Sequence, residues 1–316
     1  MLKQVIEVVE LVDRLKVTGD DIRKLFSSYG NEKVDIELVR SDKGESQVLK
    51  LMIPGTEGKS SGGKAPTLGI LGFLGGVGAR PHLTGLVSDG DGAVAALAVG
   101  LKLCDMRQRG DRLPGDVLVA THICTDAPVI PHEPVPFMGS PIGVKVLNDH
   151  VVDPRMEGVL SIDTTKGNRI INRRGFAISP TVKEGYILRV DEELLNLQQY
   201  VTGQLPTVFT LSTQDITPYG NDLYHLNSIL QPATATRAPV VGVAITAEIP
   251  VPGCATGASH EVDIELAARF AVEVAKSFTT GRTRFYDPEE FDRLNRLYGS
   301  MSHLQTLGRR EAKEGS

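Results

Sequence analysis

Apolar runs typical of buried strands alternate with segments of helical spacing over most of this chain. Strands are expected at TLGILGFLGG (67–76), DVLVATHIC (116–124), GVLSIDT (158–164), TVFTLST (207–213) and APVVGVAIT (238–246). Helices are expected over 93–107, 192–203, 222–231 and 260–278. This alternation predicts an α/β fold, with a mostly parallel central sheet of about eight strands covered by helices on both faces.

The N-terminal part predicts two helices followed by two strands. Apolar positions repeat with helical spacing over 2–16, and Thr18 with Asp21 predicts a capping box for a helix that runs to about Tyr29. VDIELV (34–39) and QVLKLMIPG (47–55) alternate as strands do. No linker is apparent, so residues 1–300 are expected to form a single domain, followed by a polar tail over 301–316.

Composition narrows the class of partner. The formal charge is −5, Trp is absent, and no long basic run occurs, which argues against nucleic acid or an anionic membrane. No apolar run reaches the roughly 18–20 residues that cross a bilayer. Cys104, Cys124 and Cys254 lack metal-knuckle spacing and fit a reducing cytoplasm. A soluble cytoplasmic protein that acts on a small molecule is therefore expected.

The stretch SDGDGAVAALAVGLKL (88–103) places Asp89 and Asp91 in a turn before a small-residue helix. One interpretation is helix capping by a carboxylate. The other is a metal ligand, because ligands of open α/β sheets bind beyond the carboxyl ends of the strands. Asp126, Asp163 and His260 follow three other expected strands in the same relative place. Carboxylate and imidazole together suit zinc, manganese or iron.

The stretch HICTDAPVIPH (122–132) adds a histidine to this set. If the strand continued, His122 would share a face with Cys124 and Asp126. The alternative interpretation is a core histidine without a chemical role. His132 lies in a proline-rich loop that could fold back toward the same edge.

The order of these elements and residues resembles the co-catalytic zinc aminopeptidases and carboxypeptidases of the leucine- and glutamyl-aminopeptidase type. The chain is also similar to an uncharacterised bacterial family, domain of unknown function 1177, which implies no mechanism. The peptidase resemblance implies a three-layer sandwich of zinc-exopeptidase type. It implies that Asp89, with Gly92 behind it, is the metal-bridging aspartate, and that Asp163, His260 and Asp126 are the other metal ligands.

Three positions depart from the peptidase pattern. Phe73 stands where the family has a metal-binding histidine, and Gly75 where it has the supporting aspartate. Thr125 replaces the glutamate that serves as general base, and threonine cannot accept a proton at neutral pH. The resemblance then implies one metal, zinc first with manganese or iron as alternatives, held by Asp89, Asp126 and His260.

The expected function is hydrolysis of a C–N bond in a small amide or peptide-like substrate by a metal-dependent enzyme. The catalytic candidates are His122 as proton carrier, Thr125 at the general-base position, and Asp163, which would bind the metal or orient water. Because Thr125 cannot act as the base, His122, His132 or Glu133 would have to replace it. Arg80, His82 and the pair Arg173 and Arg174 could meet a substrate carboxylate, although a solvated face is the alternative. Two other functions stay open: a catalytically inactive binding or assembly protein on the same fold, and a lyase or isomerase. The fold analogy suggests a homo-oligomer.

Overall fold

The computed structural model describes the chain except residues 15, 32, 74–78, 81–84, 220, 222, 224–228 and 309–316, and the side chains of residues 79 and 80. The helices are α1 (Leu2–Val12), α2 (Gly19–Ser28), α3 (Asp91–Gln108), α4 (Val144–Val151), α5 (Glu192–Thr202), α6 (Glu261–Thr279) and α7 (Pro288–Tyr298). The strands are β1 (Val34–Ser41), β2 (Gly44–Ile53), β3 (Leu68–Gly72), β4 (Ala79–Arg80), β5 (Val117–Ile123), β6 (Ala127–Ile130), β7 (Phe137–Met138), β8 (Gly158–Thr164), β9 (Gly175–Ile178), β10 (Thr181–Lys183), β11 (Tyr186–Leu188) and β12 (Val240–Thr246).

Within the described residues, nine strands form one mixed sheet in the order β1-β2-β5-β3-β8-β12-β10-β11, with β9 also paired to β12. The central strands β5, β3, β8 and β12 are parallel, and the strands outside them are antiparallel. After β3 the chain continues to β5, on one side of the neighbouring pair β3 and β8. After β8 it continues to β12, on the other side of that pair. The carboxyl ends of β3 and β8 therefore flank the switch point at which open α/β sheets bind ligands.

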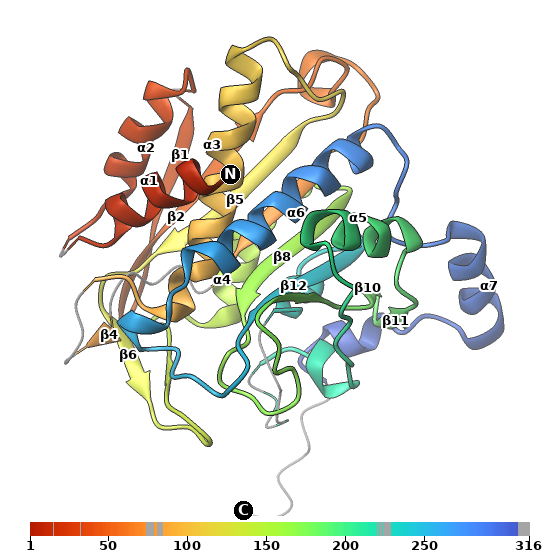
Figure 1. The fold of residues 1–316 in the computed structure, drawn as a ribbon. Helices are drawn as coiled ribbons and strands as arrows, with labels where there is room; N and C mark the ends of the chain where they lie inside the picture. The colour runs from red at the N-terminus through yellow and green to blue at the C-terminus, as the bar shows by residue number, and fades with distance from the viewer. Residues whose placement is uncertain are drawn as a thin grey trace, which may run out of the picture.

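Helices cover both faces of this sheet (Figure 1). On one face α3 and α6 lie side by side, α1 packs against both, and α5 packs against α6. The other face is covered by α4 and by the segment around Phe209, Ile216 and Leu230. The three-layer α/β fold predicted from the sequence is confirmed.

Helix α3 is buried along nearly its whole length because it lies between the sheet and the helices α1 and α6. A helix enclosed on all sides needs small side chains, which explains the run of alanine and glycine. Its first turn is the tightest place: a Cβ on Gly92 would lie 2.5 Å from the carbonyl oxygen of Ile162 and 2.9 Å from that of Phe73. The start of α3 thus rests directly on the ends of β3 and β8.

The substitution Gly92→Ala is expected to lower the free energy of unfolding by about 1–3 kcal/mol, because backbone carbonyls cannot move aside for the added methyl group. Urea-induced unfolding measures the change. Gly100→Ala in the same helix is the matched control: its Cβ would meet only side-chain ends, those of Leu51 and Phe26 at 3.0 Å. The helix-propensity gain of about 1 kcal/mol offsets that contact, so equal losses in the two variants would contradict the prediction.

Most predicted elements are present, with shifts at their ends. The capping box at Thr18 and Asp21 is confirmed, whereas α1 ends at Val12 instead of residue 16. The strand predicted at 207–213 is wrong, because only Val208 pairs there, in an isolated bridge with Ile178. Most of the helix predicted at 222–231 lies outside the described residues. No helix in the described ranges is long and apolar enough to cross a membrane.

Candidate active site

The carboxyl edge of the parallel strands holds a buried ion pair between Asp91 and Lys166. Asp91 opens α3 and Lys166 follows β8, so the pair spans the switch point. The Lys166 ammonium lies 2.5 Å from Asp91 Oδ2, and the two side chains are 1% and 0% exposed. Lys166 also donates to the carbonyl of Ala258 at 2.7 Å. This pair therefore ties the loop before α6 to the start of α3.

A serine hydroxyl completes this set. Ser259 is half-buried, lies just before His260, the N-cap residue of α6, and donates from Oγ to Asp91 Oδ1 at 2.6 Å. Burial raises the pKa of Asp91 to about 6, while Lys166 and then Ser259 act in the opposite direction. Asp91 is thus ionised at neutral pH but holds a proton more readily than an exposed aspartate does. A carboxylate of this kind can accept a proton from a neighbouring hydroxyl during a reaction.

Asp89 lies beside this set and is held by neutral donors. Its Oδ2 accepts from the Met138 amide at 3.0 Å, and its Oδ1 accepts from the Thr164 hydroxyl at 2.9 Å. Burial raises the pKa of the Asp89 carboxyl. The backbone of Gly253 is pressed against it, since a Cβ there would lie 2.2 Å from Asp89 Oδ2. Asp89 therefore shapes the loop around residue 253 and does not cap α3, whose N-cap residue is Gly90.

Helix α6 begins at this edge without a side-chain cap. Its N-cap residue His260 makes no capping hydrogen bond. His260 Nδ1 instead lies 3.4 Å from Asp263 Oδ2, and Arg174 Nε lies 3.6 Å from Asp263 Oδ1. Amide groups in the first turn of a helix have no partner within that helix, and the positive end of its dipole favours negative charge. The start of α6 therefore offers donors for an oxygen that gains charge.

The residues predicted as metal ligands lie in different elements and differ in burial. Asp163 is buried at the end of β8 and accepts from the Thr164 amide at 2.7 Å. Asp126 is exposed and Thr125 half-buried, both in the turn after β5, which ends at Ile123. His260 lies at the N-cap of α6. The structure thus brings Asp89 and Asp163 to one edge through the adjacent Thr164.

The positions of these residues decide whether they could hold a zinc ion together. Among the described residues, no group of three or more His, Cys, Asp or Glu is positioned to hold a metal ion. Asp91 directs its carboxylate to Lys166 and Ser259, and Asp89 directs both oxygens to neutral donors. The described side chains therefore do not fit the expected site of Asp89, Asp126 and His260. Residues 75 and 82 and the side chain of residue 80 lie outside the described part of the chain.

His122 lies in the interior of the sheet. It is 2% exposed on β5, on the face it shares with Leu118 and Ala120, and its Nδ1 lies 3.0 Å from Ser46 Oγ. Burial lowers the pKa of His122 to about 4. At neutral pH the imidazole is therefore uncharged.

This burial predicts a pH dependence of stability. Because the folded-state pKa lies below the ordinary value near 6.5, the unfolded chain binds the proton more readily, and stability falls as the pH falls from 6.5 to 4. His122→Gln removes the titrating group. The stability advantage of the parent over this variant should shrink by up to about 3 kcal/mol between pH 7 and pH 4, measured by urea unfolding. Parallel profiles for the two proteins would contradict this.

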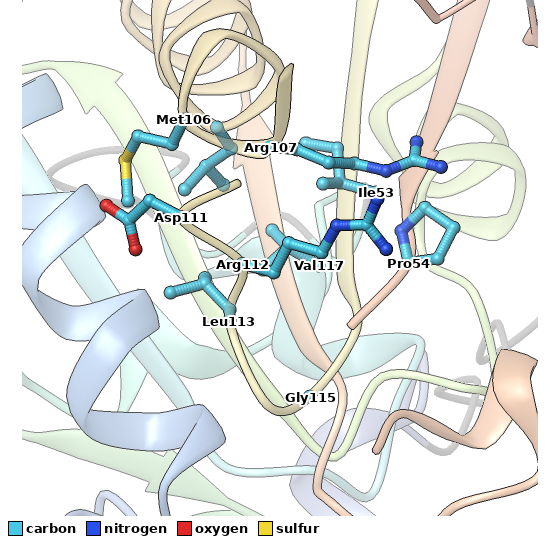
Figure 2. A pocket seen from close by; sticks show the side chains of 10 residues that line it. Ile53, Pro54, Met106, Arg107, Asp111, Arg112, Leu113, Gly115 and Val117 are labelled. Carbon is cyan, nitrogen blue, oxygen red and sulfur yellow. The ribbon is translucent and has the colours of Figure 1, made fainter. Parts of the chain in front are cut away.

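A hollow lies at the opposite edge of the sheet, where β5 begins (Figure 2). Its floor is apolar, with Ile53, Leu113 and Val117, and Arg107 and Arg112 extend along one side of it toward Pro54. It lacks the combination of hydroxyl, carboxylate and amine found at the carboxyl edge. The candidate active site is therefore the set of Asp91, Lys166 and Ser259.

Of these three residues, only Asp91 belongs to a stretch singled out from the sequence, and it was not among the predicted metal ligands or catalytic residues. Lys166 follows a buried strand in DTTKG, and Ser259 directly precedes His260. The signal for Lys166 is its position just beyond the end of the buried strand β8, the same relative place as the predicted carboxylates. Ser259 was not considered, because the neighbouring His260 matches the terminal metal-binding histidine of the peptidase pattern.

Comparison with known proteins identifies a family. A family described as protein of unknown function (DUF1177) matches residues 37–308. No curated protein matches the chain. Among solved structures, the fold is similar to a leucine aminopeptidase of Caenorhabditis elegans, with 13% sequence identity and a TM-score of 0.49 over 87% of this chain. The chain spans 66% of that aminopeptidase's length.

Proposed function

This chain belongs to the DUF1177 family of proteins of unknown function, and from its carboxyl-edge site we propose that it hydrolyses a C–N bond in small amides. One observation carries the proposal: the Ser259 hydroxyl donates to the Asp91 carboxylate, whose other oxygen is held by the buried Lys166 ammonium. A nucleophile bonded to a base that a third group orients is the general arrangement for acyl transfer.

Each residue has a distinct role in the proposed reaction. Ser259 Oγ attacks the amide carbonyl carbon, and its proton passes to Asp91. Asp91 then gives this proton to the leaving nitrogen as the C–N bond breaks, which leaves an ester on Ser259. A water molecule, deprotonated by Asp91, hydrolyses that ester and restores the hydroxyl. Lys166 keeps Asp91 oriented throughout and favours its ionised form before each proton transfer.

The start of α6 supplies the second requirement of acyl transfer. The carbonyl oxygen becomes negative as Ser259 attacks, and it needs hydrogen-bond donors already in place. Ser259 lies one residue before the N-cap residue His260, and the amides of Glu261 and Val262 belong to the first turn of the uncapped helix. The helix dipole adds favourable potential at the same place.

The metal-dependent hydrolase expected from the resemblance is the second candidate, with zinc first and manganese or iron as alternatives. Its support is that Asp89 and Asp163 both lie at the carboxyl edge, where each accepts a hydrogen bond from Thr164. Burial also raises the pKa of the Asp89 carboxyl, and a nearby cation would offset this cost of ionising it. A binding or assembly protein without catalysis is the alternative from another class.

An activity screen separates these functions. The full chain is incubated with short peptides, N-acylated amino acids and primary amides, with EDTA or with added zinc or manganese, and release of amine is measured. The serine mechanism predicts turnover that EDTA does not change. Turnover lost in EDTA and restored by zinc would favour the metal-dependent enzyme, and absence of turnover in every condition would favour the binding protein.

A further inference from the structure

A separate hollow lies between β9, the end of α5 and the first turns of α6, and encloses about 320 Å³, part of it open to solvent. Its lining includes Arg173, Arg174, Phe176, Gln204 and Leu266. It flanks the beginning of α6 but shares none of its lining residues with the set of Asp91, Lys166 and Ser259.

Arg173 carries a positive charge that its neighbours leave uncompensated. Its guanidinium donates to the Thr207 hydroxyl and to the side-chain oxygen of Gln204, both of which are neutral. In the described ranges no carboxylate lies within ion-pair distance of it. These two bonds fix the plane of the guanidinium while leaving its charge available to an anion.

The walls around Arg173 are held rigidly. The buried Gln198 amide donates to the carbonyls of Phe176 and Thr207 and accepts from the Thr207 amide at 3.0 Å. The Thr246 hydroxyl at the end of β12 donates to the Arg173 carbonyl. A site that is already ordered spends little free energy on ordering when a ligand binds.

The remaining lining indicates the class of ligand. Arg174 adds a second guanidinium, 68% exposed and only partly offset by Asp263 at 3.6 Å. Phe176 and Leu266 provide apolar surface on the same hollow. Planar guanidinium groups match carboxylates with paired hydrogen bonds. We propose that this hollow is a binding site for a small organic carboxylate with a short aliphatic body.

The test uses two ligands with the same branched aliphatic body, one with a carboxylate head group and one with a neutral alcohol. Neither has a C–N bond, so the result is independent of the proposed hydrolysis. Binding of 4-methylpentanoate and of 4-methyl-1-pentanol to the full chain is measured by calorimetry. The carboxylate should bind and the alcohol should bind much more weakly. Arg173→Gln should weaken carboxylate binding about tenfold or more. Arg112→Gln, in the hollow at the opposite edge, is the matched control and should leave binding unchanged.

Several results would overturn the proposal. These are no binding of 4-methylpentanoate, equal binding of the alcohol, or equal weakening by Arg112→Gln. Sulfate binding as tightly as 4-methylpentanoate would show a site for simple anions instead. If Arg173→Gln does not fold, the variant Arg174→Gln, at an exposed position, decides the question. Because it removes one of two positive charges, carboxylate binding should weaken at least threefold. Unchanged binding would contradict the proposed site.

Discussion

Replacing Lys166 by methionine is expected to lower the free energy of unfolding by about 3–5 kcal/mol at pH 7, because Asp91 is left buried without its cation. Both side chains are essentially inaccessible to water. The loss should shrink at pH 5, since an unpaired buried carboxyl takes up a proton and becomes neutral. Urea unfolding at the two pH values measures both effects.

Two controls make this result specific to the buried pair. Lys145→Met removes the partner of Asp149 in an exposed ion pair on α4, which is worth about 0–1 kcal/mol. The double variant Asp91→Asn with Lys166→Met removes both charges and should recover part of the loss, giving a coupling energy in a double-mutant cycle. A Lys166→Met loss no larger than that of Lys145→Met would contradict the prediction.

Ser259→Ala is expected to reduce amide hydrolysis by about 10³-fold or more, because it removes the attacking oxygen. Folding should be affected little, since one partly buried hydrogen bond contributes about 1 kcal/mol. The rate of amine release and urea unfolding are measured on the same preparations.

The control for this variant comes from the same loop. Thr256→Ala changes an exposed hydroxyl within the short turn before Ser259 and should keep full activity. A fluorophosphonate probe should label the parent chain on Ser259 and leave Ser259→Ala unlabelled, as read by mass spectrometry. Activity retained by Ser259→Ala would remove the serine from the mechanism.

The central elements could be predicted from the sequence because their signals are local. The runs that became β5, β8 and β12 are mostly apolar and are buried at every position, as strands covered on both faces are. Strand order is set by contacts far apart in sequence, so the antiparallel strands beyond β12 could not be predicted. The residues of 207–213 favour a strand, but only Val208 finds a pairing partner.

The candidate site was predicted in part, for the same physical reason. The rule that ligands lie at strand exits selects the edge where Asp89 and Asp163 both accept hydrogen bonds from Thr164. Asp126 was placed by extending the alternation of β5 past Ile123, where the strand ends and the chain turns outward. Lys166 is far from Asp91 in sequence, and no local pattern pairs a lysine with an acid across a sheet.

The position of β12 has a consequence for biosynthesis. This strand lies between β8 and the earlier-made strands β9 and β10. While the ribosome is still translating the preceding residues, β8 has no neighbour on that side, and the edges of β9 and β10 that later pair with β12 are unpaired. The nascent chain then exposes unpaired strand edges, which are the surfaces that aggregate most readily. A chaperone that shields them should matter most until Val240–Thr246 has emerged.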